Sequence, residues 1–215
     1  MSKSGLKISD VNEIEKIFAK RTPKIMGNFV DFAVLVPLVK KDGELNLLFE
    51  VRSANLKTQP SEVCFPGGKI EEGESAENCA IRETAEELGI DYDDIRIITE
   101  LDTLHNYTNL TLYSFLGEIE YDKLVNAKIN HKEVESVFYV PLAEFVLNEP
   151  YIYKMKVIPD IGDDFPYDMI NTDSYNWRKG DSEVPIYQVH EEKIWGLTAR
   201  ICHNLAKILK EELKL

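Results

Sequence analysis

Three glutamates, Glu83, Glu86 and Glu87, lie within five consecutive residues of the stretch "RETAEELG" (82–89), with Arg82 beside them. Like charges one helical turn apart destabilise an exposed helix by about 0.2–0.5 kcal/mol per pair. At about 100° per residue, the three carboxylates fall in one sector of about 100°. This sector flanks a packing face formed by Ile81, Thr84, Ala85 and Leu88. Small residues occupy the same sector one or two turns earlier, so the spacing predicts a concave carboxylate patch.

Such a patch suits a hard divalent cation. Mg²⁺ prefers oxygen ligands in octahedral geometry and usually completes its coordination shell with water and substrate phosphates. Carboxylates one turn apart can share one ion or bridge two. A bound ion would remove the repulsion among the glutamates, whereas without one they would form a solvated acidic helix face. The residues upstream of the helix favour the metal site.

The upstream segment "FPGGKIEEGE" (65–74) contains a proline followed by two glycines. Gly67 and Gly68 can adopt backbone conformations that other residues avoid, so a carbonyl of this turn could face the metal. The turn leads into a helix expected from Ser75 to Leu88, with Ser75 as its N-cap and Gly89 ending it. Long loops in a compact domain, such as residues 55–74, are usually functional.

These residues together resemble the Nudix box, a pattern that here spans residues 68–90. Gly68, Glu74 and the run "RETAEELGI" fill every position at which the pattern has a fixed identity. The one departure is Thr84, where the family prefers an aliphatic residue, and it faces the core. The resemblance implies an α/β/α sandwich with a mixed β-sheet between helices. It also implies a hydrolase that uses Mg²⁺ or Mn²⁺ to cleave a nucleoside diphosphate linked to another moiety.

The family pattern assigns roles to residues of this chain. Glu83 and Glu87 would be metal ligands, and Glu86 a further direct or water-mediated ligand. Arg82 would orient a glutamate, and Gly68 would belong to the loop that supplies a backbone carbonyl to the metal. The resemblance therefore makes Glu86, Glu87 and Arg82 the catalytic candidates, while Glu74 is more often structural.

Residues 47–69, "LLFEVRSANLKTQPSEVCFPGGK", are similar to the coenzyme A pyrophosphatase subgroup of this family. In that subgroup a Leu-Leu…Arg strand leads through a polar loop into Val-x-Phe-Pro-Gly-Gly, and "IWGLTARI" (194–201) resembles its terminal helix. Lys57, Gln59 and Ser61 depart from the Arg, His and Gly expected there. Lys57 keeps the charge but lacks the two-pronged geometry with which arginine binds phosphate. Coenzyme A is the leading substrate.

Hydrolysis of coenzyme A or an acyl-CoA would release 3′-phosphoadenosine 5′-phosphate and 4′-(acyl)phosphopantetheine. Arg52 and Lys57 are candidates for contacts with substrate phosphates, although they could equally be ordinary surface cations. The general base is one of the box glutamates or a carboxylate of another loop, such as Glu133 or Glu135. The rival functions are hydrolysis of a nucleotide sugar, dinucleoside polyphosphate or oxidised nucleotide, and a non-catalytic module that senses a nucleotide.

The elements that must position these residues follow from the hydrophobic pattern. Nearly continuous apolar residues at 29–39 indicate a strand covered on both faces. Further strands are expected at 45–53, 95–105, 110–120, 134–140, 151–158 and 185–189, and an amphipathic helix at 194–213. The polar stretch between 159 and 184 has no clear pattern. The whole chain, residues 1–215, is expected to form a single α/β domain.

Composition narrows the partners of this 215-residue chain. Its formal net charge of −13 disfavours nucleic acid, because an acidic surface repels phosphate backbones. No segment approaches the ~18 apolar residues needed to cross a membrane, and the first residues lack a signal-peptide core, so a cytoplasmic location is expected. Three cysteines without paired spacing indicate reduced thiols. An apolar N-terminal helix and the aromatic region 150–177 offer surfaces on which a homodimer could form.

Overall fold

The computed structural model describes residues 10–23 and 25–215. Its centre is a mixed sheet of eight strands within the described residues, in the order β3-β2-β1-β7-β5, with β4, β6 and β8 pairing beside this path. β1 runs parallel to β7 and antiparallel to β2 and β4. The strands are β1 (Val30–Lys41), β2 (Glu44–Arg52), β3 (Val63–Cys64), β4 (Gly67–Lys69), β5 (Ile95–Glu100), β6 (Leu104–Asn106), β7 (Leu110–Ile119) and β8 (Val134–Pro141).

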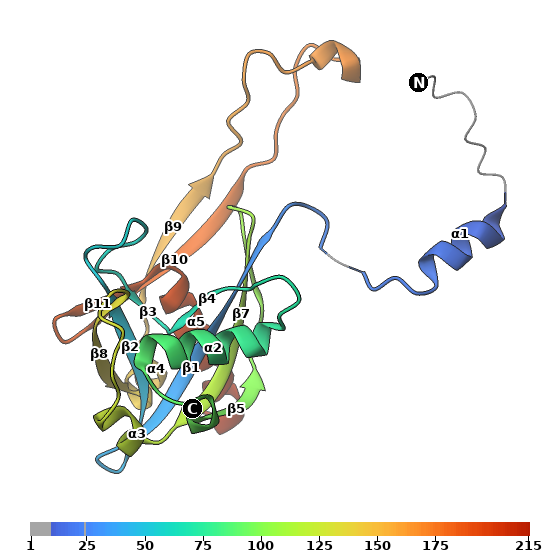
Figure 1. The fold of residues 1–215 in the computed structure, drawn as a ribbon. Helices are drawn as coiled ribbons and strands as arrows, with labels where there is room; N and C mark the ends of the chain where they lie inside the picture. Colours follow the sequence, from blue (N-terminus) through green and yellow to red (C-terminus); the bar gives the residue numbers. More distant parts are fainter. Residues whose placement is uncertain (1–9, 24) are drawn as a thin grey trace.

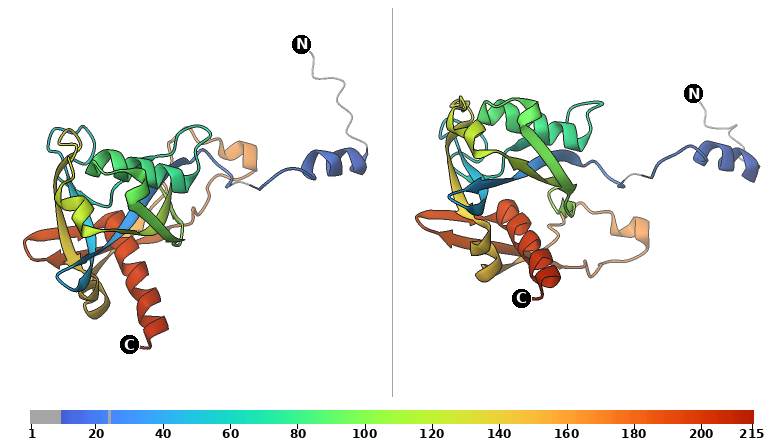
Figure 2. Two further views of the ribbon diagram at one scale, coloured as in Figure 1. Left: turned by 60° about the horizontal axis from the view of Figure 1, so that its bottom comes forward. Right: turned by 90° about the horizontal axis from the view of Figure 1, so that it is seen from below.

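Helices cover both faces of this sheet (Figures 1 and 2). Helix α2 (Ala76–Leu88) packs on one face, whereas α4 (Leu142–Leu147) and α5 (Gly196–Leu213) pack on the other. Of two short helical turns, η1 (Tyr92–Asp94) connects α2 to β5, and α3 (Tyr121–Val125) connects β7 to β8. The predicted fold class, an α/β/α sandwich with a mixed sheet between helices, is confirmed.

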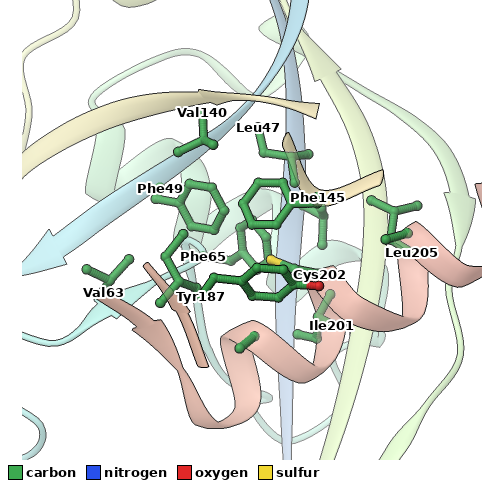
Figure 3. Packing of buried hydrophobic residues seen from close by; sticks show 14 of the residues in the cluster. Leu47, Phe49, Val63, Phe65, Val140, Phe145, Tyr187, Ile201, Cys202 and Leu205 are labelled. Carbon is green, nitrogen blue, oxygen red and sulfur yellow. The ribbon is translucent and has the colours of Figure 1, made fainter. Parts of the chain in front are cut away.

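The core forms two layers because the sheet is buried on both faces. Leu35 of β1 packs in the layer under α2, and its neighbour Val36 packs in the layer under α5, since successive side chains of a strand point to opposite faces. Figure 3 shows the second layer, where the ring of Phe49 stacks on that of Phe65 with centroids 4.7 Å apart. The ring of Phe145 of α4 also packs against the Phe49 ring, with centroids 5.8 Å apart.

The strands that follow α4 in the sequence form a second, three-stranded sheet. It contains β9 (Tyr151–Val157), β10 (Gly180–Val189) and β11 (Glu192–Trp195), in the order β11-β10-β9 among the described residues. Tyr187 of β10 joins the core layer under α5. The segment between β9 and β10 projects from the body of the molecule and carries the turn η2 (Tyr167–Ile170) near its tip (Figure 1).

The observed limits of three elements differ from those expected from the sequence. The strand expected at 95–105 is two strands, β5 and β6, with residues 101–103 between them. β10 begins at Gly180 rather than 185, because its first half pairs with β9 through polar residues that lack a hydrophobic pattern. The last helix begins at Gly196 rather than 194, because Trp195 still pairs with Ile186 of β10.

The N-terminal helix α1 (Val11–Phe18) has no buried side chain and lies away from the sheets (Figure 1). Asp10 caps it by accepting a hydrogen bond from the backbone N–H of Asn12 at 2.9 Å. In the described part of the chain, no helix combines the length and apolarity needed to cross a membrane.

Candidate active site

Helix α2 carries the three glutamates, and the sequence fixes both of its ends. The hydroxyl of Ser75 accepts a hydrogen bond from the backbone N–H of Asn78 at 3.1 Å, an N-cap of the kind that contributes about 1 kcal/mol. Gly89 ends the helix in the left-handed conformation, with a φ of 68°. The predicted helix limits are confirmed.

Strand β4 brings the two glycines of the upstream turn against α2. The backbone N–H of Gly67 donates a hydrogen bond to Oε2 of Glu87 at 2.9 Å. Gly68 lies so close to Glu83 that a β-carbon built on it would be 2.4 Å from the Glu83 carboxyl carbon. The missing side chain at Gly68 therefore makes room for this carboxylate. The carbonyl of Gly68 accepts a hydrogen bond from the thiol of Cys79, with Sγ 3.6 Å away.

The three glutamates differ in their surroundings. Glu87 is 2% exposed, and the side chain of Glu83 is 18% exposed. The side chain of Glu86 is 55% exposed, and its carboxylate lies 3.6 Å from Nη1 of Arg82. The structure thus brings Glu83 and Glu87 together beside Gly67 and Gly68, and it leaves Glu86 at the solvent edge.

Arg82 links the loop to the helix. Its Nε and Nη2 donate to the two carboxylate oxygens of Glu74 at 2.8 and 3.0 Å, and its Nη1 donates to Oε1 of Glu83 at 2.8 Å. The hydrogen bonds from Arg82 lower the pKa of Glu74 to about 2, and the pKa of Arg82 is itself raised by this pairing. Arg82 therefore holds the Glu83 carboxylate in place while Glu74 holds Arg82.

A fourth glutamate, Glu50 of β2, belongs to the same cluster and was missed in the sequence. It is 1% exposed; its Oε1 accepts a hydrogen bond from the Cys64 thiol at 3.3 Å, and its Oε2 has no partner among the described residues. Burial raises the pKa of Glu50, as do the charges of Glu133 and Glu83. The signal was present: Glu50 is the one acidic residue in the apolar run "LNLLFEV".

The pKa of Glu87 is raised by burial and by neighbouring carboxylates, as is that of Glu50. Burial is the largest cause that raises the pKa of Glu87, followed by the charge of Glu50, while the hydrogen bond from Gly67 opposes the shift. Glu83 and Glu133 add smaller contributions in the same direction as burial. The buried Glu50 and Glu87, the partly buried Glu83 and the exposed Glu133 therefore act on one another in one acidic region.

The donor set of this cluster fits a hard divalent cation, because it offers carboxylate oxygens and one unpartnered buried oxygen of Glu50. In the residues that the structure describes, no three side chains of His, Cys, Asp or Glu form a ready-made metal cage. Water and substrate phosphate oxygens commonly complete the shell of Mg²⁺. The cluster could therefore supply part of such a shell, with water or a phosphate oxygen as the remaining ligands.

A pocket of about 840 Å³, here called the metal pocket, opens over the cluster. Glu83, Glu87 and Glu133 lie in its wall, and so does Arg52, whose Nε is buried without an acceptor in the described chain. Lys57 is exposed and lines no part of it. Of the two candidate cations, Arg52 therefore lines the pocket and Lys57 does not.

The remaining wall of the metal pocket comes from distant parts of the sequence. Tyr107, Met155, Trp195 and Leu197 give it an apolar and aromatic side. The start of α5 is fixed beside the upstream loop by Thr198, whose hydroxyl donates to the carbonyl of Val63 at 3.2 Å. Glu135, the second loop carboxylate considered as a base, is exposed and lines no part of the pocket.

Comparison with known proteins finds a family match and relatives that cover most of the chain. The NUDIX domain matches residues 31–160. The peroxisomal coenzyme A diphosphatase NUDT7 of Mus musculus is 36% identical over 182 residues, covering 84% of this chain and 71% of that protein. The mitochondrial coenzyme A diphosphatase NUDT8 of Mus musculus is 27% identical over 213 residues, covering 97% of this chain and 92% of that protein.

Two further relatives extend the comparison. Nudix hydrolase 3 of Caenorhabditis elegans is 27% identical over 211 residues and covers 94% of this chain and 84% of its own length. Among solved structures, a MutT/nudix family protein from Enterococcus faecalis superposes with a TM-score of 0.50 at 13% identity, covering 94% of this chain and 70% of that one. At this identity the superposition supports the fold alone.

Proposed function

Because the chain belongs to the Nudix family of hydrolases, we propose that it hydrolyses the diphosphate bond of coenzyme A or of an acyl-CoA, with Mg²⁺ or Mn²⁺ at the carboxylate cluster. The observation that carries the proposal is the metal pocket: Glu83 and Glu87 lie on one side of it, and Arg52 offers an unused buried N–H. The two relatives named as coenzyme A diphosphatases favour this substrate over other nucleoside diphosphates.

Each box residue has a distinct task in this proposal. Glu83 and Glu87, with Glu86 from the solvent edge and the carbonyl of Gly68, would hold the ion. A divalent cation held there would neutralise charge on the diphosphate and activate water for attack. Arg82 keeps the Glu83 carboxylate in position through its 2.8 Å hydrogen bond, so we assign Arg82 a positioning role.

The chain's other residues would bind the substrate and move the proton. Arg52 would donate to a phosphate oxygen of the diphosphate, and this hydrogen bond would satisfy its buried Nε. The attacking water forms a bond to one phosphorus while the bridging P–O bond breaks, and the second phosphate leaves with the electron pair. We assign the water proton to Glu133, because this carboxylate lines the pocket and Glu135 does not.

The test is a hydrolysis assay with coenzyme A in the presence of Mg²⁺ or Mn²⁺, with ADP-ribose and diadenosine polyphosphates as parallel substrates. We expect 3′-phosphoadenosine 5′-phosphate and 4′-phosphopantetheine as the products of coenzyme A, resolved by chromatography. Cleavage of another substrate with coenzyme A untouched would reject the proposed substrate. Titration with each ion alone, followed by calorimetry, identifies the metal.

The variant Glu87→Gln tests the carboxylate cluster, and Glu77→Gln is its matched control. Glu77 is an exposed residue in the first turn of the same helix and undergoes the same loss of charge. We expect Glu87→Gln to lower kcat by about 10²- to 10³-fold, the range seen when one preorganised charge-stabilising group is removed. Its melting temperature in metal-free buffer should stay near that of the wild type. Near-normal turnover by Glu87→Gln would rule out its role as a ligand.

We also propose that the chain forms a homodimer and acts in the cytoplasm as a single domain. Exposed apolar side chains on α1 and near η2 support the dimer, among them Val11, Phe18 and Met169. Light scattering on the full chain measures its oligomeric state. Because relatives are named as peroxisomal and mitochondrial proteins, imaging of a tagged chain in cells is the measurement that decides the compartment.

A further inference from the structure

A second pocket of about 670 Å³ lies next to the metal pocket. We call it the distal pocket. The two share wall residues, among them Asn106, Ser182, Arg200 and Ile201. The two pockets are therefore neighbours, and Arg200 lines both of them.

Two buried polar atoms in the wall of the distal pocket lack partners within the described chain. Ser114 of β7 is 1% exposed, and its hydroxyl makes no hydrogen bond there. Oδ1 of Asn106 is also buried and accepts no hydrogen bond from a described residue. A buried polar group without a partner costs about 1–3 kcal/mol. Such groups therefore point to a polar ligand or water that satisfies them when the pocket is filled.

One face of α5 supplies hydrogen-bond donors to the distal pocket. Arg200, His203, Asn204 and Lys207 recur three or four residues apart, so they lie on one side of the helix, and all four line the pocket. In the described structure, neither Arg200 nor Lys207 lies within 4.0 Å of a carboxylate oxygen. Two cations on this face are therefore available to an anionic ligand.

The pocket also contains carboxylates, but two of them have partners. Asp102 accepts a hydrogen bond from the side-chain amide of Asn204 at 2.8 Å. Asp181 forms an ion pair with Lys156. The third, Glu183, is exposed and lies in the wall shared with the metal pocket. Of these three carboxylates Asp181 is neutralised by an ion pair, while Asp102 has a neutral hydrogen-bond donor. In the described structure, Arg200 and Lys207 have no carboxylate within 4.0 Å.

We propose that the distal pocket binds the nucleoside half of the substrate, and that Arg200 and Lys207 contact a phosphomonoester on it that is separate from the diphosphate being cleaved. Ser114 and Asn106 then hydrogen-bond to the hydroxyl and amino groups of the nucleoside. This inference rests on the proposed function, in which the nucleoside of coenzyme A carries a 3′-phosphate. It makes Arg200 a determinant of specificity for 3′-phosphorylated substrates.

Binding of nucleotides without metal tests the pocket apart from catalysis. Calorimetry would compare adenosine 3′,5′-bisphosphate with AMP on the wild type and on Arg200→Met, Lys207→Met and Arg178→Met. Arg178 is an exposed cation that lines neither pocket, so it controls for the loss of one charge. We expect the wild type and Arg178→Met to prefer the bisphosphate by about 10- to 100-fold, the range for hydrogen bonds to a charged group. Arg200→Met and Lys207→Met should each reduce this preference.

Equal affinity of the wild type for the two nucleotides would overturn the proposal. So would an unchanged preference in both Arg200→Met and Lys207→Met. Circular dichroism first checks that Arg200→Met is folded, because Arg200 is half-buried. Lys207 is exposed, and its variant therefore keeps the test decisive if Arg200→Met is unfolded.

Hydrolysis of coenzyme A and 3′-dephospho-coenzyme A separates this inference from the proposed function. A kcat/KM that favours coenzyme A, with the ratio reduced in Arg200→Met but kept in Arg178→Met, supports both. Equal kcat/KM for the two substrates supports the function and overturns the pocket assignment. No hydrolysis of either substrate, together with a retained preference for the bisphosphate in calorimetry, overturns the function and supports the pocket assignment.

Discussion

The adjacent glycines of the upstream turn allow one experiment to separate stability from metal binding. In Gly68→Ala, the new methyl carbon would be 2.4 Å from the Cδ and Oε1 atoms of Glu83. Because carbon contacts are normally about 3.5 Å or longer, the carboxylate must move by about 1 Å. The contact is with the end of a flexible side chain, so refitting it costs folding about 1 kcal/mol and lowers Tm by only about 2–4 °C.

The same displacement has a much larger effect on the site. A misplacement of about 1 Å in a catalytic group can cost about 10²-fold in rate. We therefore expect Gly68→Ala to lower kcat by about 10²-fold and to weaken Mn²⁺ binding, while its fold remains intact.

Gly67→Ala should instead cause a large loss of folding stability. Its methyl carbon would lie 2.3 Å from the backbone oxygen of Ala33 and 2.6 Å from Cα of Val34, and the φ of Gly67 is 152°. These neighbours belong to β1 at the centre of the sheet and cannot move aside. Overpacking and backbone strain together cost about 2–6 kcal/mol, which corresponds to a fall in Tm of roughly 5–20 °C.

Thermal melting in EDTA, calorimetry with Mn²⁺ and steady-state kinetics measure the three quantities. Wild-type turnover and Mn²⁺ affinity in Gly68→Ala would show that the missing side chain at Gly68 does not position Glu83. A wild-type melting temperature in Gly67→Ala would show that β1 tolerates the added methyl group. Mn²⁺ binding needs no substrate, so the comparison holds whichever diphosphate is hydrolysed.

Three further predictions concern the same cluster. Arg82→Lys loses the paired hydrogen bonds to Glu74, so Glu83 is held less firmly and kcat should fall by about 10-fold or more. An unchanged kcat would contradict the positioning role of Arg82. Without metal, the folded-state pKa of Glu50 is raised from 4.5 to about 7 and that of Glu87 to about 9. Between pH 5 and pH 9 the folded protein therefore binds more protons than the unfolded chain. Tm should accordingly fall as pH rises through this range. Added Mn²⁺ should reduce this fall, and a Tm that rises with pH in EDTA would contradict the shifts. Glu50→Gln removes one buried charge, so in EDTA at pH 8 it should melt at or above the wild-type temperature; a clear decrease would show that the Glu50 carboxylate stabilises the metal-free fold.

Much of the fold could be predicted because its elements follow local rules. Ser75 and Gly89 mark the ends of α2, and the continuous apolar run of β1 predicts a strand buried on both faces. The first half of β10 could not be predicted, because Gly180–Val184 is held by backbone pairing to β9 rather than by an apolar face. The start of α5 was misplaced for a related reason, since Trp195 is retained by a neighbouring strand.

The candidate site was predicted along the helix but not across the sheet. Helical spacing gives the angular positions of Glu83, Glu86 and Glu87, yet it cannot tell that one side of their sector faces β4 and the other faces solvent. Glu50 is separated from the box in sequence, so its approach to Glu87 depends on the pairing of β2 and β3 beside the turn. Lys57 was a candidate for its charge and its position in the loop, but it is exposed and lines no part of the metal pocket.

The hydrogen bond between Thr198 and Val63 joins residues 135 positions apart. It has a consequence for the protein during synthesis, because chains emerge from the ribosome N-terminus first. The carboxylate helix is complete once residue 88 has been made, but the wall that contains Trp195, Leu197 and Arg200 is added only after residue 200 has been made. A chain that ends before α5 would therefore contain the proposed metal ligands without this wall of the pocket. We expect such a chain to bind Mn²⁺ but to lose its selectivity among substrates.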